Sequence, residues 1–145
     1  MRRLGAELGV TQPVIYSAFP GGRQALIDAV ALQGFDAIAT ALEVVPVEPL
    51  ARMRAYLAFA ADQPRIYEAM FSMPTGLTFG SGAGPDPLQR AFAAIEAAFP
   101  GADGTAAEVA WASIHGLATL EISERLPAVR SEARLAYLHR ALTED

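Results

Sequence analysis

A stretch close to the N-terminus constrains this chain most, because it predicts two short helices joined by a tight turn. Leu4 and Leu8 are four residues apart and so share one helix face, and Gly9 follows as the left-handed residue that commonly ends a helix. Thr11 can then cap a second helix, and Pro13 lies in its first turn, where a missing N–H costs nothing. This arrangement is a helix-turn-helix, whose second helix enters the major groove of DNA.

The second predicted helix divides its side chains between packing and recognition. Val14 and Phe19 point back toward the first helix, which leaves the polar side chains outward. The residues expected to approach base edges, where Gln suits adenine, are Gln12, Pro13, Val14 and Ser17. Those suited to phosphate contacts are Thr11, Tyr16 and Arg23. The structural alternatives are that Thr11 only caps its helix and that Tyr16 partly packs.

This N-terminal segment resembles the DNA-binding module of the TetR family of bacterial transcriptional repressors. The likeness is carried by the Gly-Val-Thr turn at Gly9, by the Tyr three residues before Phe19, and by the basic residue Arg23 at the start of the next helix. There are two departures. The family places another helix, typically with basic residues before it, ahead of this pair, whereas the chain begins at Met1 inside the second helix. The second departure is that the family's Phe-x-x-Lys is replaced in this chain by Phe19-Pro-Gly-Gly-Arg23, which is one residue longer and has Arg in place of Lys. We therefore expect this form to bind DNA weakly or not at all.

Composition predicts an all-α protein. The chain has 145 residues, of which 52% are hydrophobic, and much of the apolar content is Ala, a strong helix former. Alternating β-branched runs are absent from the sequence. Since there are no Cys residues, disulfides, thiolate catalysis and Cys-ligated metals are excluded. No leader and no apolar run near 18 residues is apparent, so we expect a cytoplasmic protein with no membrane partner and no cofactor.

The net charge of −5 is unevenly distributed along the chain. Residues 1–30 carry a net charge of +1, and residues 31–145 carry −6. A nucleic-acid binder needs local positive charge rather than a positive total. The value of +1 is small for phosphate contacts, so the absent N-terminal segment would have to contribute more.

Apolar spacing and Pro/Gly punctuation predict two domains, a helix-turn-helix with its connecting helix over 1–43 and an effector-binding and dimerisation domain over 44–145. A Thr-x-x-Glu capping box is expected at Thr105 and Glu108. The Gly/Ser-rich segment 73–85 is predicted to be a loop; no strand precedes it and no Lys follows it, so a phosphate cradle is rejected. The predicted helices cover residues 23–43, 49–62, 65–72, 86–99, 105–123 and 127–142.

The C-terminal half adds a second resemblance. Trp111-Ala-Ser-Ile-His-Gly116 is similar to the Trp-x-x-x-His-Gly signature of one class of TetR-type effector domains, and Pro64-x-x-Tyr-x-x-Met-Phe71 is similar to that class as well. The resemblance implies that the last two helices form a four-helix bundle with those of a second subunit, and that each effector domain encloses a ligand cavity.

The residues themselves also favour a dimer. The last two helices carry more large apolar side chains than a peripheral hairpin needs to bury, and an exposed patch of that size usually marks an interface. The alternative is that all of them serve the internal core. The expected interface residues are Ile114, Leu117, Leu120, Leu135, Leu138 and Leu142.

For the effector pocket, Met and aromatic side chains are the typical lining of an adaptable apolar site. Ordinary core packing is an equally good reading for each of them, and a lone His on an apolar face is more often a satisfied core group. No inward basic pair is apparent, so the effector should be neutral and apolar or aromatic. The expected pocket residues are Tyr67, Met70, Phe71, Trp111 and His115.

These observations together predict a ligand-responsive transcriptional regulator, a repressor that binds double-stranded operator DNA as a homodimer and is released by a small effector. The alternative is a helical small-molecule-binding or dimerisation module that does not bind DNA in this form. An enzyme is not expected: His115 and His139 lie on different helices, and the Glu-x-x-His pairs of a carboxylate-bridged metal site are absent.

Overall fold

The computed structural model describes residues 21–71 and 86–144, and every regular element in those ranges is a helix, which confirms the all-α prediction. The predicted helix-turn-helix, which we call the reading head, includes the expected DNA contacts at residues 11–17. These residues and the segment 73–85 lie outside the described residues. The elements in chain order are α3 (Gly22–Glu43), α4 (Pro49–Asp62), α5 (Pro64–Phe71), α6 (Asp86–Ala98), α7 (Thr105–Ile122), the 3-10 turn η1 (Ala128–Arg130) and α8 (Ser131–Thr143).

Proline sets several of these helix starts. Pro49 occupies the first turn of α4, where its missing N–H breaks no helical hydrogen bond. The same helix ends at Asp62 because Gln63 precedes Pro64 and adopts a non-helical backbone (φ −128°, ψ 56°). Helix α6 likewise begins at Asp86, next to Pro87. These boundaries agree with the predicted ones to within a residue or two.

The predicted capping box at Thr105 is wrong. Gly104 is the residue before α7, in a left-handed conformation (φ 82°), and Thr105 is already the first residue of the helix. The carboxylate of Asp103 accepts the backbone N–H of Thr105 at 3.0 Å. That hydrogen bond also lowers the pKa of Asp103. The free N–H at this helix end is therefore satisfied by the residue two positions before Thr105.

The last helix also starts later than predicted. Residues 128–130 form η1, and α8 begins at Ser131. Before this turn, α7 ends in a Schellman motif: the N–H of Arg125 bonds the carbonyl of Leu120 at 2.9 Å, and the N–H of Glu124 bonds Glu121 at 3.1 Å. Glu124 holds the left-handed position of this motif, with φ 59°.

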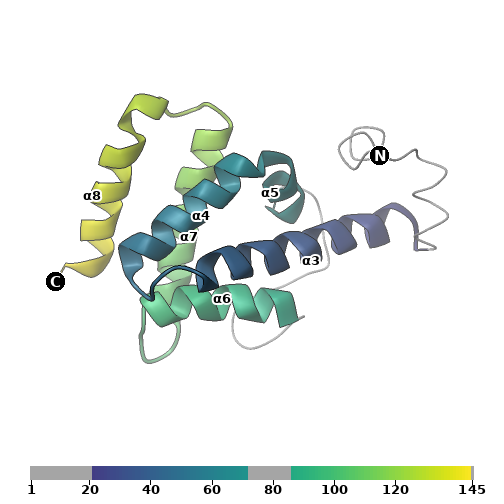
Figure 1. Cartoon of the computed structure of the whole chain (residues 1–145), viewed down its shortest axis with the longest axis horizontal. Helices are drawn as coiled ribbons and strands as arrows, with labels where there is room; N and C mark the ends of the chain where they lie inside the picture. Colours follow the sequence, from purple (N-terminus) through teal and green to yellow (C-terminus); the bar gives the residue numbers. More distant parts are fainter. Residues whose placement is uncertain (1–20, 72–85, 145) are drawn as a thin grey trace.

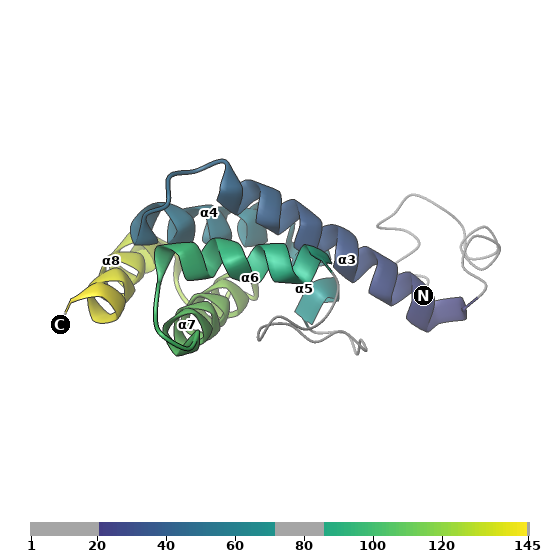
Figure 2. The same cartoon turned by 90° about the horizontal axis from the view of Figure 1, so that it is seen from below.

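The helices pack around one main core, and α8 lies at an outer edge of the molecule. Helix α3 runs alongside α6, α4 crosses above them in Figure 1, and α7 lies behind α4, while Figure 2 shows α7 and α6 stacked below α3. Side chains from α3, α4, α6 and α7 meet in the interior. The largest of those with less than 2% exposure include Phe35, Ile38, Leu42, Met53, Tyr56, Leu88, Ile95 and Ile114.

Helices α3 and α5 approach each other closely at Gly34. A Cβ at this position would lie 2.5 Å from Cγ and Sδ of Met70 and 3.0 Å from Cγ2 of Ile66, closer than packed carbon atoms ordinarily come. Ile66 also packs against a second small cluster formed by Leu26, Ile27, Val30 and Ala69. Helix α5 therefore supports the N-terminal half of α3 directly.

Two arginines tie helices together at the other end of α3. The Arg52 side chain, only 4% exposed, donates to the carbonyls of Ala94 on α6 at 2.6 Å and of Pro46 in the α3–α4 loop at 3.3 Å. Arg90 of α6 forms an exposed network with Asp36 and Glu43 of α3, and this hydrogen bonding lowers the pKa of Glu43. The first contact is buried and the second lies on the surface.

Candidate functional site

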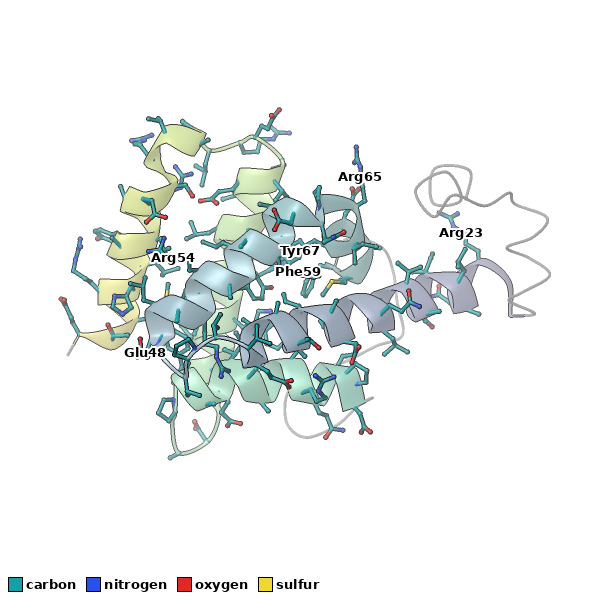
Figure 3. All side chains as sticks on the ribbon, in the orientation of Figure 1. Arg23, Glu48, Arg54, Phe59, Arg65 and Tyr67 are labelled. Carbon is teal, nitrogen blue, oxygen red and sulfur yellow. The ribbon has the colours of Figure 1, made fainter. Side chains whose placement is uncertain are left out.

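Four of the five predicted pocket residues gather where α5 faces α7. The ring centroids of Phe71 and His115 are 4.4 Å apart, those of Tyr67 and Phe71 4.8 Å, and those of Tyr67 and His115 5.6 Å. Tyr67 lies in the middle of the molecule (Figure 3). Trp111 joins the group less directly, through the residue described next. The spacing of short α5 therefore turns two of its aromatic side chains toward one face of α7.

Tyr56 of α4 is the central residue that the sequence analysis missed. Its side chain is fully buried, and its ring meets those of Tyr67 (5.9 Å) and Trp111 (6.5 Å) edge to face. Phe35 and Phe92 were missed as site residues too. The ring centroids of Phe35 and Phe71 are 5.3 Å apart, and Phe92 stacks on Trp111 with its centroid 5.9 Å away. Such edge-to-face and offset pairs stabilise an aromatic cluster beyond simple burial.

Met70 of α5 packs against α3. Its Cγ and Sδ occupy the space beside Gly34, and the side chain is 4% exposed. The structure therefore places Met70 at the α3–α5 contact, within the same buried core cluster as Tyr67 and Trp111.

A continuous hydrogen-bond chain crosses the aromatic cluster. The indole Nε1–H of Trp111 donates to Oη of Tyr56 at 2.9 Å. The Tyr56 and Tyr67 hydroxyls are 2.8 Å apart, and Oη of Tyr67 is 2.5 Å from Nδ1 of His115. We call these four residues the relay. The relay satisfies polar groups that would otherwise be costly to bury among aromatic rings.

Burial sets the ionisation of the relay. It raises the pKa of both Tyr56 and Tyr67 far above that of an exposed phenol, so both hydroxyls keep their hydrogens. Desolvation by burial lowers the pKa of His115 below 6.5. The relay is therefore neutral around pH 7.

Two surface hollows adjoin this region. One, of about 330 Å³, lies between the start of α5 and the end of α7 and includes Tyr67 in its wall, together with Arg65, Glu68 and Thr119. The other, of about 580 Å³, lies between α3, α4 and α5, is lined mainly by Ala and Gly with Phe59 and Ile66, and has Gln33, Asp62 and Gln63 as polar groups. Both volumes fall near the range of small-molecule sites.

Arg52 is a buried basic residue on the side of α4 that faces α6. The prediction that no inward basic pair is present is not contradicted by this one buried guanidinium. Because its hydrogen bonds go to backbone carbonyls of the α3–α4 loop and of α6, it has a structural role outside the aromatic cluster.

The six residues predicted to form a dimer interface occupy different environments. Ile114 and Leu135 are buried within the core of their own subunit and offer little surface to a partner. Leu138 and Leu142 pack partly against that core. On the outward side of α7, Leu117 is half-buried and Leu120 is 43% exposed. Further exposed apolar side chains, missed in the sequence, are Val109 (52%), Val129 (90%) and Tyr137 (70%).

Of the predicted DNA contacts, only Arg23 is among the described residues. It is exposed, in the first turn of α3, at the end of this helix that lies far from α8 (Figure 3). Within residues 21–71 and 86–144, no group of three or more His, Cys, Asp and Glu side chains is placed to hold a metal ion. In the same ranges only α3 is long and apolar enough to cross a membrane. Half of its most apolar 18-residue stretch is buried inside the protein, as in a core helix.

Comparison with known proteins identifies the family. Residues 50–144 match the family described as "Tetracyclin repressor-like, C-terminal domain". No curated protein sequence matches the chain. The crystal structure of "putative regulatory protein SCO4313" is similar, with a TM-score of 0.69 and 18% identity over 99% of this chain and 84% of its own. A protein with unknown function from Rhodococcus sp. RHA1 gives a TM-score of 0.62 and 25% identity over 97% of this chain and 81% of its own. Since the family match covers more than half of the sequence, the chain belongs to the tetracycline repressor-like (TetR) family of ligand-binding regulators.

Proposed function

We propose that the protein is a ligand-responsive transcriptional repressor that binds operator DNA as a homodimer through residues 1–43. A small apolar or aromatic effector, bound beside the relay in residues 44–145, releases the DNA. The reading contacts are assigned to Thr11, Gln12, Pro13, Val14, Tyr16, Ser17 and Arg23.

One observation carries this proposal: α5 contacts both the relay and the helix next to the reading head. Tyr67 and Phe71 face His115 of α7, while Ile66 and Met70 fill the space against Gly34 of α3. Helix α3 is continuous from Gly22 to Glu43 and begins directly after the proposed reading head. Packed interfaces move as units rather than deforming gradually, so a displacement of α5 would change the tilt of α3.

The mechanism is a shift between two head spacings. A ligand that packs on Phe71 and His115 favours the position of α5 that makes room for it, and α3 follows through Met70 and Gly34. The two half-sites of an operator lie one helical turn of DNA apart, so they can be bound only at one spacing of the reading heads of the two subunits. The ligand therefore lowers DNA affinity to the extent that it binds the other spacing more tightly.

The dimer is assigned to the outward face of α7 together with α8. Val109 and Leu120 are exposed there, and a Cβ built on Gly116 meets no atom within 4 Å. A Gly in the middle of a helix costs about 1 kcal/mol relative to Ala, and nothing in the described part of the subunit requires one at this position. Close approach of a second helix at Gly116 would account for it. Leu117, Leu138 and Leu142 extend the same apolar face.

Sedimentation velocity of two matched variants tests the dimer. Leu120→Glu places a charge on the proposed interface, and Val47→Glu does the same at a comparably exposed apolar residue (59%) in the α3–α4 loop. We expect Leu120→Glu to sediment as a monomer with unchanged helical content, and Val47→Glu to remain a dimer. Dimeric Leu120→Glu would contradict the assigned face.

A gel shift tests DNA binding. The probe is the DNA flanking the protein's own gene, and the proteins are this chain, an extended chain with an added upstream basic helix, and Arg23→Glu in each. We expect weak or no retardation by the 145-residue form and specific retardation by the extended one, reduced at least ten-fold by Arg23→Glu because a phosphate contact becomes a repulsion. Tight binding by the short chain would show the first expectation to be wrong.

A second candidate function is a ligand-binding and dimerisation module that does not bind DNA. Its basis is the matched C-terminal domain, residues 50–144, which lies within the proposed effector-binding and dimerisation domain. The two functions differ in one result: the module would form dimers and bind ligand while the extended chain also fails to retard DNA.

A further inference from the structure

The larger of the two surface hollows, of about 580 Å³, is separate from the relay, and we call it the outer hollow. It lies between α3, α4 and α5, and none of the four relay residues forms part of its wall. Space remains between α3 and α4 here because the residues that line it from both helices are small. They are Ala37 and Ala41 of α3 and Ala55 and Ala58 of α4. Larger side chains at these positions would fill the hollow.

The outer hollow is apolar over most of its length. Its lining runs along α3 from Gln33 to Val44, about 16 Å at 1.5 Å per residue. Phe59 lies between α4 and α3 (Figure 3), and both Phe59 and Ile66 are only half-buried. Val44 is 76% exposed. Because these side chains remain in contact with water, an apolar ligand that covered them would gain free energy.

The polar residues of the outer hollow lie at one end of it. Gln33 belongs to α3, whereas Asp62 is the last residue of α4 and Gln63 follows it. Ile66, three residues after Gln63, has its Cγ2 atom only 3.0 Å from a Cβ built on Gly34, which is the neighbour of Gln33. The end of α4 therefore lies beside the Gln33 end of the lining, and the opposite end is apolar.

Among the described residues that line the outer hollow, only Asp62 is charged. Within the described part of the chain, its carboxylate makes no hydrogen bond or ion pair, and neither do the side-chain amides of Gln33 and Gln63. The next basic residue along the chain, Arg65, points away from α3 (Figure 3) and pairs with Glu68 at 3.5 Å. A carboxylate without a partner at the end of an apolar surface favours a cation and disfavours an anion.

We propose that the outer hollow binds a small apolar cation, an amine whose ammonium group is held at Asp62 and whose alkyl chain or ring covers Phe59 toward Val44. A protonated primary amine has three hydrogens to donate and no acceptor. The carboxylate of Asp62 and the amide oxygens of Gln33 and Gln63 supply acceptors at the same end. This site is additional to the effector site beside the relay, and the inference does not depend on the proposed function.

Isothermal titration calorimetry with three probes tests the charge of the ligand. Octylamine, 1-octanol and octanoate share one alkyl chain, and at pH 7 they are a cation, a neutral molecule and an anion. We expect octylamine to bind the full chain at least five-fold more tightly than 1-octanol, and octanoate to bind most weakly. Asp62→Asn should remove the preference for octylamine and leave the affinity for 1-octanol unchanged. Glu48→Gln, the control, removes the same charge from an exposed residue before α4, outside the wall, and should keep the preference.

A second pair of variants tests the location. Ala58 and Ala61 are both exposed on α4, but only Ala58 lines the outer hollow. We expect Ala58→Phe to lower the affinity for both octylamine and 1-octanol at least ten-fold because the ring occupies the space of the alkyl chain. Ala61→Phe should leave both affinities unchanged. Circular dichroism and sedimentation velocity should give the helical content and oligomeric state of the wild type for both variants.

Several results would overturn this inference. Equal affinities for octylamine and 1-octanol, or a preference that survives Asp62→Asn, would contradict the cation. Octylamine that does not saturate the protein, or that binds Ala58→Phe as tightly as the wild type, would contradict the site. A change of oligomeric state in Ala58→Phe alone would show that a second copy of the chain covers the outer hollow. The gel shift and the Leu120→Glu experiment are independent of all these results, so the repressor proposal is decided separately.

Discussion

The two faces of α7 differ in what the subunit provides for them. The inward face carries Trp111 and Ile114, which are buried in the main core, and the indole N–H of Trp111 donates to Tyr56 of α4. The outward face carries Val109, Leu120 and Gly116, and nothing in the described part of the same subunit covers them. One helix therefore contributes both to a finished core and to a surface that still exposes apolar area to water. The contrast shows that apolar content alone does not tell a core face from an interface.

The two faces should differ most in how much the free energy of unfolding falls when one leucine-sized side chain on each face is truncated to Ala. Ile114→Ala removes a fully buried side chain and should lower the free energy of unfolding by about 2–4 kcal/mol. Leu120→Ala removes a 43% exposed one and should cost the subunit less than about 1 kcal/mol. Urea unfolding at protein concentrations low enough to dissociate a dimer measures both. Equal losses would remove the distinction between the faces.

Replacing one of two glycines, Gly34 or Gly116, by Ala should change stability by a smaller amount and in opposite directions. Gly34→Ala would bring a Cβ to within 2.5 Å of Met70 and 3.0 Å of Ile66, and overpacking of this kind costs roughly 1–3 kcal/mol, more than the gain in helix propensity returns. Gly116→Ala has open space and should stabilise the isolated subunit by about 1 kcal/mol while weakening the dimer. Thermal unfolding and sedimentation equilibrium distinguish the two effects. A stabilised Gly34→Ala would contradict the close contact of α3 and α5.

A smaller effect is the pH dependence of the inward face. Burial lowers the pKa of His115 in the folded state below its unfolded value of 6.5. The unfolded chain therefore takes up the proton first as pH falls, so the associated stability is complete above pH 6.5 and is lost as pH decreases through the lowered folded pKa. We expect the urea midpoint to fall between pH 7.5 and 5 by more in the wild type than in His115→Gln. Parallel curves would show that His115 is not held neutral by its surroundings.

The smallest expected effect concerns the end of α7, where both faces stop. Glu124 holds a left-handed backbone, with φ 59°, that glycine adopts without steric cost. Glu124→Gly should therefore raise the free energy of unfolding by about 0.5 kcal/mol, and Arg125→Gly, one residue on, should lower it. Differential scanning calorimetry resolves the order of the two midpoints.

Most helix boundaries could be predicted because single residues determine them. Pro49, Pro64 and Pro87 mark helix starts through the lack of a backbone N–H and a fixed φ, and these are local properties. The first residue of α7 was predicted correctly, but its cap was not. Thr105 and Glu108 fit a capping box, whereas the observed cap, Asp103 before a left-handed Gly104, depends on backbone geometry that the sequence does not display.

The site could be predicted only in part for a related reason. Tyr67, Phe71, Trp111 and His115 stand close together in two short motifs, so the resemblance named them. Tyr56 was missed because its hydrogen-bond partners, Tyr67 and Trp111, are 11 and 55 residues away in sequence. Contacts at that separation are set by how helices pack, and periodicity within one helix carries no record of them.

Arg52 has a consequence for how the molecule can move. Its guanidinium joins the α3–α4 loop to α6 through two directional bonds to backbone carbonyls, and a lysine, with one compact ammonium, could not reproduce that fork. The opposite junction, at Gly34, depends on the thioether of Met70, a side chain with several rotatable bonds that adapts to changes in its surroundings. The contacts made by Arg52, near the C-terminal end of α3, are therefore rigid, whereas the contact between Gly34 and Met70, closer to its N-terminal end, can adjust. We expect α3 to pivot about the stiff end, so that a small adjustment beside α5 is amplified along the length of the helix toward residue 22.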